Sequence, residues 1–129
     1  MPKSKKLILL VEDDEFLAEL YSTKLQLEGY NVVLATDGAK GLKIAKEKQP
    51  MLILLDILLP KMDGFEVLQE IRKDPVTKKM PVILLTNLSQ RSEVQKGLDL
   101  GANDYLIKAH FMPSEVITKI NKHITGLKG

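Results

Sequence analysis

The 129-residue sequence has no cysteine, no apolar run long enough to cross a membrane, and no large excess of charge of one sign. Without cysteine there can be no disulfide, no thiolate metal site and no cysteine nucleophile, and this composition fits a reducing cytosol. The first apolar run, Leu7–Val11, is too short for a signal peptide or a membrane span, so we expect neither export nor membrane insertion. Lys and Arg number 19 against 17 Asp and Glu, and the resulting charge of +2 gives no reason to expect a nucleic-acid or membrane partner.

Glycine-rich phosphate-binding loops are also missing. The sequence contains neither G-x-G-x-x-G nor a P-loop, so a flavin or nucleotide site of that kind is not expected. The first apolar run is followed instead by Glu12, Asp13 and Asp14, whose carboxylates would repel a phosphate unless a metal ion lay between them.

The length and composition indicate a single domain. A chain of 129 residues lies near the commonest domain size, and its 44% of hydrophobic residues is enough to fill one core. No internal repeat, low-complexity run or Gly/Ser linker divides it. We therefore expect residues 1–129 to form one domain, with its core at about 6–125.

Strand-like and helix-like segments alternate along the chain. Continuous apolar runs at Leu7–Val11, 51–55 and 82–85 are typical of parallel strands buried on both faces, and weaker strand candidates lie at 32–35 and 105–107. Apolar residues recur at helical spacing near 17–25, 39–48, 65–71, 94–100 and 116–124. Strict alternation with right-handed crossovers predicts an α/β fold, in which one parallel sheet is covered by helices on both faces.

Polar residues follow the strand candidates at the points where ligands bind in such sheets. Glu12 and Asp13 follow the first run, Asp56 follows the third strand, Thr86 the fourth and Lys108 the fifth. The carboxyl ends of parallel strands share one edge of the sheet, so we expect these side chains to lie together. Each alone could be an ordinary cap of a strand or helix end, with Lys108 paired to an aspartate.

The combination of these groups favours phosphoryl transfer. Crowded carboxylates repel one another unless a cation neutralises them, and an all-oxygen site without His or Cys favours Mg²⁺ over zinc. Asp56 would then be the nucleophile that forms an aspartyl-phosphate. Lys108 would offset the charge of the phosphoryl group, and Thr86 would donate a hydrogen bond to one of its oxygens.

On these residues the sequence resembles the receiver domain of two-component response regulators, the class that includes the chemotaxis response regulator. The resemblance extends from Leu7 to about Ile124. It rests on four separate motifs: LVEDD at 10–14, LDILLPKMDG at 55–64, LT at 85–86 and GANDYLIK at 101–108. It implies a flavodoxin-like, doubly wound sheet of five strands in the order 2-1-3-4-5, flanked by five helices.

The resemblance also implies a role for each site residue. Asp56 is the expected phosphoacceptor, and Glu12 and Asp13 are the expected acidic pair that holds Mg²⁺ together with Asp56 and the main-chain carbonyl of Leu58. Thr86 is the expected switch hydroxyl, and Lys108 the expected phosphate-binding lysine.

Two further residues have competing interpretations. The resemblance makes Tyr105 an aromatic rotamer switch, whereas its ordinary interpretation is a core aromatic with its hydroxyl at the surface. Asp14 could be a third acidic ligand, but we expect it to cap the helix that begins near Glu15.

The sequence departs from the family pattern in three respects, the third of which concerns two residues. Ala109 stands where the family usually has a proline in a cis peptide, and a non-proline cis bond costs about 2.5–4 kcal/mol. Asn87 stands where the residue after the switch threonine is usually small. The positions two residues after Asp56 and Thr86 are Leu58 and Leu88; neither can orient an attacking water by hydrogen bonding, so we expect slow self-dephosphorylation.

The leading functional hypothesis is a cytoplasmic signalling switch that receives a phosphoryl group on Asp56 from a histidine kinase or a histidine phosphotransfer protein. Its output would be a contact with a downstream protein, made by the face that comprises the fourth helix, the fifth strand and the fifth helix. The protein would act as a monomer or a phosphorylation-dependent dimer, and we expect no enzymatic turnover beyond phosphoryl uptake and its slow loss. No helix-turn-helix follows Lys122, so direct DNA binding by this chain is not expected, whether it stands alone or belongs to a longer regulator.

Two alternatives belong to other classes. A degenerate receiver would keep the fold and signal without phosphate. A phosphatase of the haloacid dehalogenase type would need a second aspartate two residues after the nucleophile, where this chain has Leu58.

Overall fold

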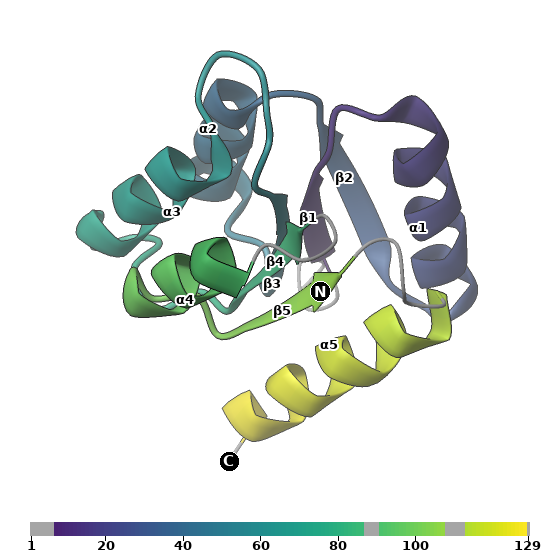
Figure 1. Cartoon of the computed structure of the whole chain (residues 1–129). Helices are drawn as coiled ribbons and strands as arrows, with labels where there is room; N and C mark the ends of the chain where they lie inside the picture. The colour runs from purple at the N-terminus through teal and green to yellow at the C-terminus, as the bar shows by residue number, and fades with distance from the viewer. Residues whose placement is uncertain (1–6, 87–90, 108–112, 129) are drawn as a thin grey trace.

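The computed structural model describes residues 7–86, 91–107 and 113–128, in which five strands alternate with five helices (Figure 1). The strands are β1 (Leu7–Val11), β2 (Asn31–Ala35), β3 (Leu52–Asp56), β4 (Val82–Thr86) and β5 (Asp104–Ile107). The helices are α1 (Glu15–Leu27), α2 (Gly38–Lys48), α3 (Gly64–Lys73), α4 (Arg91–Asp99) and α5 (Pro113–Lys128). The predicted alternation is confirmed.

All four strand pairings are parallel, and the order is β2-β1-β3-β4-β5. This is the order that the resemblance implied, and the periodicity of the sequence does not encode it. The chain starts near the middle of the sheet, winds to β2 at one border, crosses back to β3 and continues to β5 at the other. The direction of winding therefore reverses between β1 and β3, where ligands bind in sheets of this type.

The continuous apolar runs of the central strands reflect burial on both faces. Every residue of β3 and β4 is buried, and so is every residue of β1 except Leu7. The border strands β2 and β5 are more exposed, which explains why their sequence signal was weaker.

Helices cover both faces of the sheet. Helices α1 and α5 pack on one face, over residues such as Ile8, Leu10 and Leu54. Helices α2, α3 and α4 lie on the other face, against the alternate residues of the same strands, such as Leu9 and Leu55 (Figure 1).

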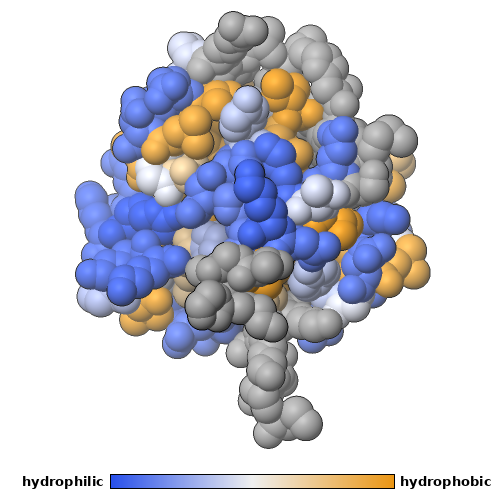
Figure 2. All heavy atoms as spheres, turned by 90° about the horizontal axis from the view of Figure 1, so that it is seen from below, coloured by the Kyte–Doolittle hydropathy of each residue, from blue (hydrophilic) through white to orange (hydrophobic). Residues whose placement is uncertain are grey.

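Among the described residues, no helix combines the length and the apolar character that a membrane crossing requires. Viewed from below, polar side chains form a broad band across the surface, with apolar patches beside it (Figure 2).

Local capping explains several helix boundaries. Asp14 is the N-cap of α1 and accepts a hydrogen bond of 3.0 Å from the Leu17 N–H, which confirms the predicted cap. After α1, Gly29 has a φ of 95°, a conformation that glycine adopts without steric cost.

Gly41 lies inside α2, where a Cβ would come within 2.8 Å of the Val11 side chain, so its presence in a helix follows from close packing on β1.

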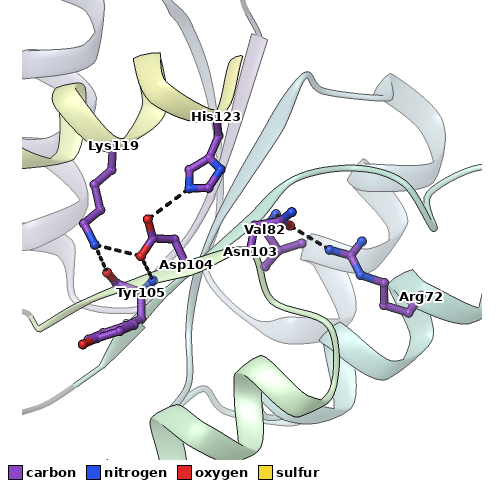
Figure 3. Close-up of polar contacts among 7 residues, drawn as sticks. All are labelled: Arg72, Val82, Asn103, Asp104, Tyr105, Lys119 and His123. Atoms are coloured by element: carbon purple, nitrogen blue, oxygen red, sulfur yellow. Dashed lines mark hydrogen bonds and ion pairs between the residues drawn. The ribbon is translucent and has the colours of Figure 1, made fainter. Parts of the chain in front are cut away.

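One half-buried arginine fastens the amino-terminal edge of the sheet. The Arg72 guanidinium, at the end of α3, donates to the carbonyls of Lys78, Met80 and Gly101 and to the Asn103 side chain. Asn103 Oδ1 also accepts from the Val82 N–H at 2.9 Å, at the start of β4 (Figure 3). Arg72 therefore ties the segments that enter β4 and β5 to α3.

Candidate functional site

Polar residues lie at or directly after the carboxyl-terminal ends of three strands, at one edge of the sheet. Val11 pairs with Leu55, so the next residues, Glu12 and Asp56, come out beside each other. Asp56 in turn pairs with Leu85, the residue before Thr86. The strands β1, β3 and β4 therefore deliver the predicted acidic and hydroxyl groups to one edge.

The structure brings together the three carboxylates that the sequence singled out. Glu12, Asp13 and Asp56 each offer a carboxylate oxygen, and these oxygens lie within 4.8 Å of one another. Glu12 and Asp56 are 1% and 3% exposed, whereas Asp13 is exposed. The cluster is therefore open to solvent at Asp13 and enclosed by protein on the side of the other two.

Backbone hydrogen bonds fix the positions of the two buried acids. The Glu12 N–H donates to the Ala35 carbonyl of β2 at 3.0 Å, and Glu12 Oε2 accepts from the Asp14 N–H at 3.1 Å. Asp56 Oδ1 accepts from the Leu58 N–H at 3.3 Å. The Ile57 N–H donates to the Leu85 carbonyl at 3.1 Å, which continues the pairing of β3 with β4 one residue beyond Asp56.

The donor chemistry of this cluster fits a hard divalent cation. Its three members offer only oxygen atoms, and two of them are buried close together, where like charges repel unless a cation compensates them. Mg²⁺ binds such sites through one or two carboxylates and keeps several waters, which the exposed side at Asp13 allows. The residues present therefore fit Mg²⁺.

The loop that follows Asp56 leads into α3, and the first residue of that helix packs tightly against the backbone of Asp56 and Ile57. A Cβ at Gly64 would lie 2.4 Å from the Asp56 carbonyl oxygen and 2.7 Å from Ile57 Cα. The Gly64 N–H donates to the Ile57 carbonyl at 2.8 Å. The start of α3 therefore lies directly on the backbone of the candidate phosphoacceptor.

The same loop also contacts the start of α2. A Cβ at Gly38 would lie 2.0 Å from the Met62 carbonyl oxygen. Lys61 has a φ of 69°, a left-handed conformation that is uncommon for a lysine, and its Nζ lies 3.8 Å from Asp37 Oδ2. Asp37 is the N-cap of α2, so this ion pair joins the loop to the helix.

Sequence reasoning missed a tyrosine whose pKa is raised by the charges of the acidic residues. Tyr21 of α1 is 2% exposed and packs in the core between α1 and the sheet. Burial raises the pKa of its hydroxyl well above the ordinary value, and the charges of Glu12, Asp56 and Asp14 raise it further. The helical spacing of the sequence places Tyr21 on the apolar face of α1, but no pattern near it in the sequence indicates that this face lies close to the carboxylates.

The remaining predicted site residues lie on β4, on β5 or beyond. Thr86 is buried at the end of β4 and pairs with Ile107, the last residue of β5. Tyr105 is partly buried and packs against the core on the face of α2 and α3. Lys108, which follows Ile107, lies outside the described residues, as do Asn87, Leu88 and Ala109. Their expected effects on the site therefore stay predictions.

Comparison with known proteins supports the resemblance. The profile of a family described as the response regulator receiver domain matches residues 8–121. A curated relative, the DNA-binding dual master transcriptional regulator RpaA of Synechocystis sp., is 43% identical over 113 residues, which make up 88% of this chain and 46% of that protein. The chain thus spans about half the length of the curated relatives it matches.

Solved structures share the fold over nearly the whole chain. The receiver domain of the sensor histidine kinase PA1611 from Pseudomonas aeruginosa, with a magnesium ion coordinated in its active site cleft, superposes with a TM-score of 0.86. It is 32% identical, and the match covers 93% of this chain and 98% of that one. A CheY-like receiver domain protein from Methanospirillum hungatei gives a TM-score of 0.88 at 29% identity, with 95% and 96% of the two chains covered.

Proposed function

Because the chain belongs to the response regulator receiver domain family, we propose that it is a signalling switch controlled by phosphorylation of Asp56. The observation that carries this proposal is the convergence of Glu12, Asp13 and Asp56 within 4.8 Å at the carboxyl ends of β1 and β3. Buried carboxylates crowded together in this way need a cation, and a cation beside a carboxylate is the arrangement that phosphoryl transfer to that carboxylate requires.

The chemical step is a displacement at phosphorus. One carboxylate oxygen of Asp56 attacks the phosphorus of a phosphohistidine, and a P–O bond forms while the P–N bond to the imidazole breaks. The electron pair of the broken bond returns to the imidazole, which leaves neutral when its other nitrogen carries a proton. The hydrogen bond from the Leu58 N–H to Asp56 Oδ1 orients the carboxylate for this attack.

We assign the cation to Glu12, Asp13, Asp56 and the main-chain carbonyl of Leu58. When bound, Mg²⁺ supplies positive charge beside the phosphoryl oxygens. Thr86 donates its hydroxyl hydrogen bond to one of these oxygens, and the Lys108 ammonium pairs with the phosphoryl group. The family pattern and the order of the strands support each of these proposed roles.

The signal would leave through the region of α4, β5 and α5. Thr86 pairs with Ile107, two residues after Tyr105, so a shift of Thr86 toward a phosphoryl group acts on the strand that carries the aromatic switch. The phosphodonor would be a histidine kinase or a phosphotransfer protein, and the target would be a protein that contacts this face. Relatives such as RpaA are named as transcriptional regulators, and regulation of transcription is one output that a longer protein containing this domain would provide.

Direct phosphorylation with a small donor tests the proposal. The full chain is incubated with phosphoramidate, with and without Mg²⁺, and its intact mass is followed. We expect a Mg²⁺-dependent gain of one phosphoryl group that is lost in Asp56→Asn. The control is Asp63→Asn, which changes an exposed aspartate of the same loop to a residue that also caps helices. Absence of an adduct in the wild type would refute the proposal and favour a receiver fold that signals without phosphate.

A further inference from the structure

We propose that Lys119 of α5 is a positioning residue for Tyr105, and that it sets how readily the tyrosine ring turns toward Thr86. The proposal rests on the proposed function in one respect, namely that Tyr105 is a switch residue. The hold of Lys119 on the ring is a separate claim and has its own measurement.

The Lys119 ammonium makes three contacts around Tyr105. Its Nζ lies 2.7 Å from Asp104 Oδ1 and 2.9 Å from the main-chain oxygen of Tyr105 (Figure 3). The same Nζ lies 5.2 Å from the centroid of the Tyr105 ring, which is within the range of a cation–π interaction. One cation is therefore bound to the backbone and to the ring of the same residue.

Asp104 keeps the ammonium in this place. The carboxylate is 14% exposed, accepts from the Tyr105 N–H at 2.8 Å, and has His123 Nε2 at 3.0 Å from its other oxygen. Burial alone would raise the pKa of Asp104, but hydrogen bonds from Lys119, His123 and the Tyr105 N–H outweigh it and hold the pKa below its ordinary value. The carboxylate thus stays charged, and the ammonium beside it has a fixed partner.

Because β5 lies at the border of the sheet, the Lys119 ammonium and the core that the Tyr105 ring packs against lie on different sides of Tyr105. β5 is a border strand, and its only strand neighbour among the described residues is β4. The N–H and the carbonyl of Tyr105 have side-chain partners, Asp104 and Lys119, so the cluster covers the open border of the sheet. Lys119 comes from α5 on one face, whereas the Tyr105 ring packs against the core on the other face.

Rotation of the ring toward Thr86 therefore has a defined consequence. Tyr105 pairs with Leu84 on β4, and Thr86 is two residues along that strand, so it lies on the same face as Leu84. Movement toward Thr86 takes the ring inward, away from the border where Nζ is held. The ring then loses its contact with the cation, while the bonds of Nζ to Asp104 and to the Tyr105 oxygen do not depend on the ring and remain.

The test uses fluorine NMR on the full chain with 3-fluorotyrosine at its three tyrosines, the Tyr105 signal being assigned with Tyr105→Phe. Spectra are recorded for the free protein and during titration with Mg²⁺ and beryllofluoride, a stable phosphoryl analogue. The variants are Lys119→Met, which keeps an unbranched chain without charge, and Lys119→Arg, which keeps the cation. The control is Lys122→Met, an exposed lysine on the same helix.

In the free Lys119→Met protein, we expect the Tyr105 signal to move toward its position in beryllofluoride-treated wild type. The ratio of the two ring orientations should change about two- to fivefold, the range for a cation–π contact at a partly exposed site. Lys119→Arg should restore the wild-type signal, and Lys122→Met should not move it. Asp104→Asn weakens the contact that holds the Lys119 ammonium but keeps a hydrogen-bond acceptor. It should therefore shift the Tyr105 signal in the same direction as Lys119→Met, by a smaller amount.

Two results separate this proposal from the proposed function. A Tyr105 signal that is the same in Lys119→Met and Lys122→Met overturns the positioning role, whatever happens at Asp56. If wild type takes no phosphoryl group and beryllofluoride moves no signal, the proposed function fails. A displaced signal in free Lys119→Met that Lys119→Arg restores then still supports the hold on the ring.

Discussion

Replacement of Gly64 by alanine is a direct test of how the candidate phosphoacceptor is held. The new Cβ would lie 2.4 Å from the Asp56 carbonyl oxygen, 2.7 Å from Ile57 Cα and 3.1 Å from the Asp56 carbonyl carbon. All three atoms belong to the backbone, so no side chain can rotate away to make room. The start of α3 and the end of β3 must move apart, and Asp56 must move with them.

The expected magnitude follows from two opposing effects. Overpacking of a well-packed interior costs about 1–3 kcal/mol, and a clash with backbone atoms that cannot rotate away belongs to the upper part of this range, about 2–3 kcal/mol. Alanine is a better helix former than glycine by about 1 kcal/mol, which offsets part of this cost because Gly64 is the first residue of α3. We therefore expect a net loss of about 1–2 kcal/mol in the free energy of unfolding, together with weaker Mg²⁺ binding and slower phosphorylation.

Gly97→Ala is the matched control for this experiment. A Cβ there would lie 2.2 Å from Leu84 Cδ1, the far end of a flexible side chain, and 3.5 Å from the Phe65 ring. Urea unfolding of both variants gives the stabilities, and a Mg²⁺ titration followed by tyrosine fluorescence reports the site. Gly97→Ala should bind Mg²⁺ as wild type does. Wild-type stability and Mg²⁺ affinity in Gly64→Ala would refute the close packing of α3 on Asp56.

Three further predictions concern the metal, the phosphoryl lifetime and pH. Mg²⁺ at 100 times its dissociation constant should stabilise the fold by about 2.7 kcal/mol. In thermal denaturation, the increase in midpoint caused by Mg²⁺ should be much smaller in Asp13→Asn than in wild type and unchanged in the exposed control Asp99→Asn. Equal increases in the two variants would contradict the ligand assignment. Leu58 is 60% exposed, and Leu58→Asn should speed loss of the phosphoryl group because an amide can hydrogen-bond the attacking water, whereas Leu27→Asn on α1 should not. Because the folded-state pKa of Asp104 is lowered, its contribution to stability should be complete above the unfolded pKa of about 3.9 and lost as pH falls through the folded pKa. Urea unfolding of wild type and Asp104→Asn at a series of pH values measures this, and a difference that does not shrink in acid would contradict it.

The sequence was most informative where the physics is local. Continuous apolar runs predicted the central strands, because strands buried on both faces have no alternation. Acids at the ends of two runs predicted the carboxylate cluster, because the carboxyl ends of parallel strands meet at one edge. The order of the strands came only with the family resemblance, since periodicity reports burial and not which strands are neighbours.

Contacts between side chains that are distant in the chain had no signal of this kind. Arg72 reaches Gly101 and Asn103, and Lys119 reaches back to Asp104. Tyr21 looked like any apolar residue of an amphipathic helix, although the charges of the acidic cluster raise its pKa. In each case the interaction depends on how helices pack on the sheet, which a local pattern does not contain.

The amino-terminal ends of β4 and β5 and the ring of Tyr105 are held by different kinds of contact, and this difference bears on how the proposed switch would work. At the amino-terminal ends, Asn103 exchanges hydrogen bonds with Val82, and Arg72 bonds to Asn103 and to the carbonyl of Gly101. These bonds are to the backbone or between polar groups with fixed partners, so displacement of either strand there would leave several of them unmade. Two residues after Asn103, the Tyr105 ring meets the Lys119 ammonium through a contact that rotation of a side chain can break and re-form. If Thr86 moves toward a phosphoryl group as proposed, we therefore expect the Tyr105 ring to follow with little resistance, while the amino-terminal ends of β4 and β5 stay in place.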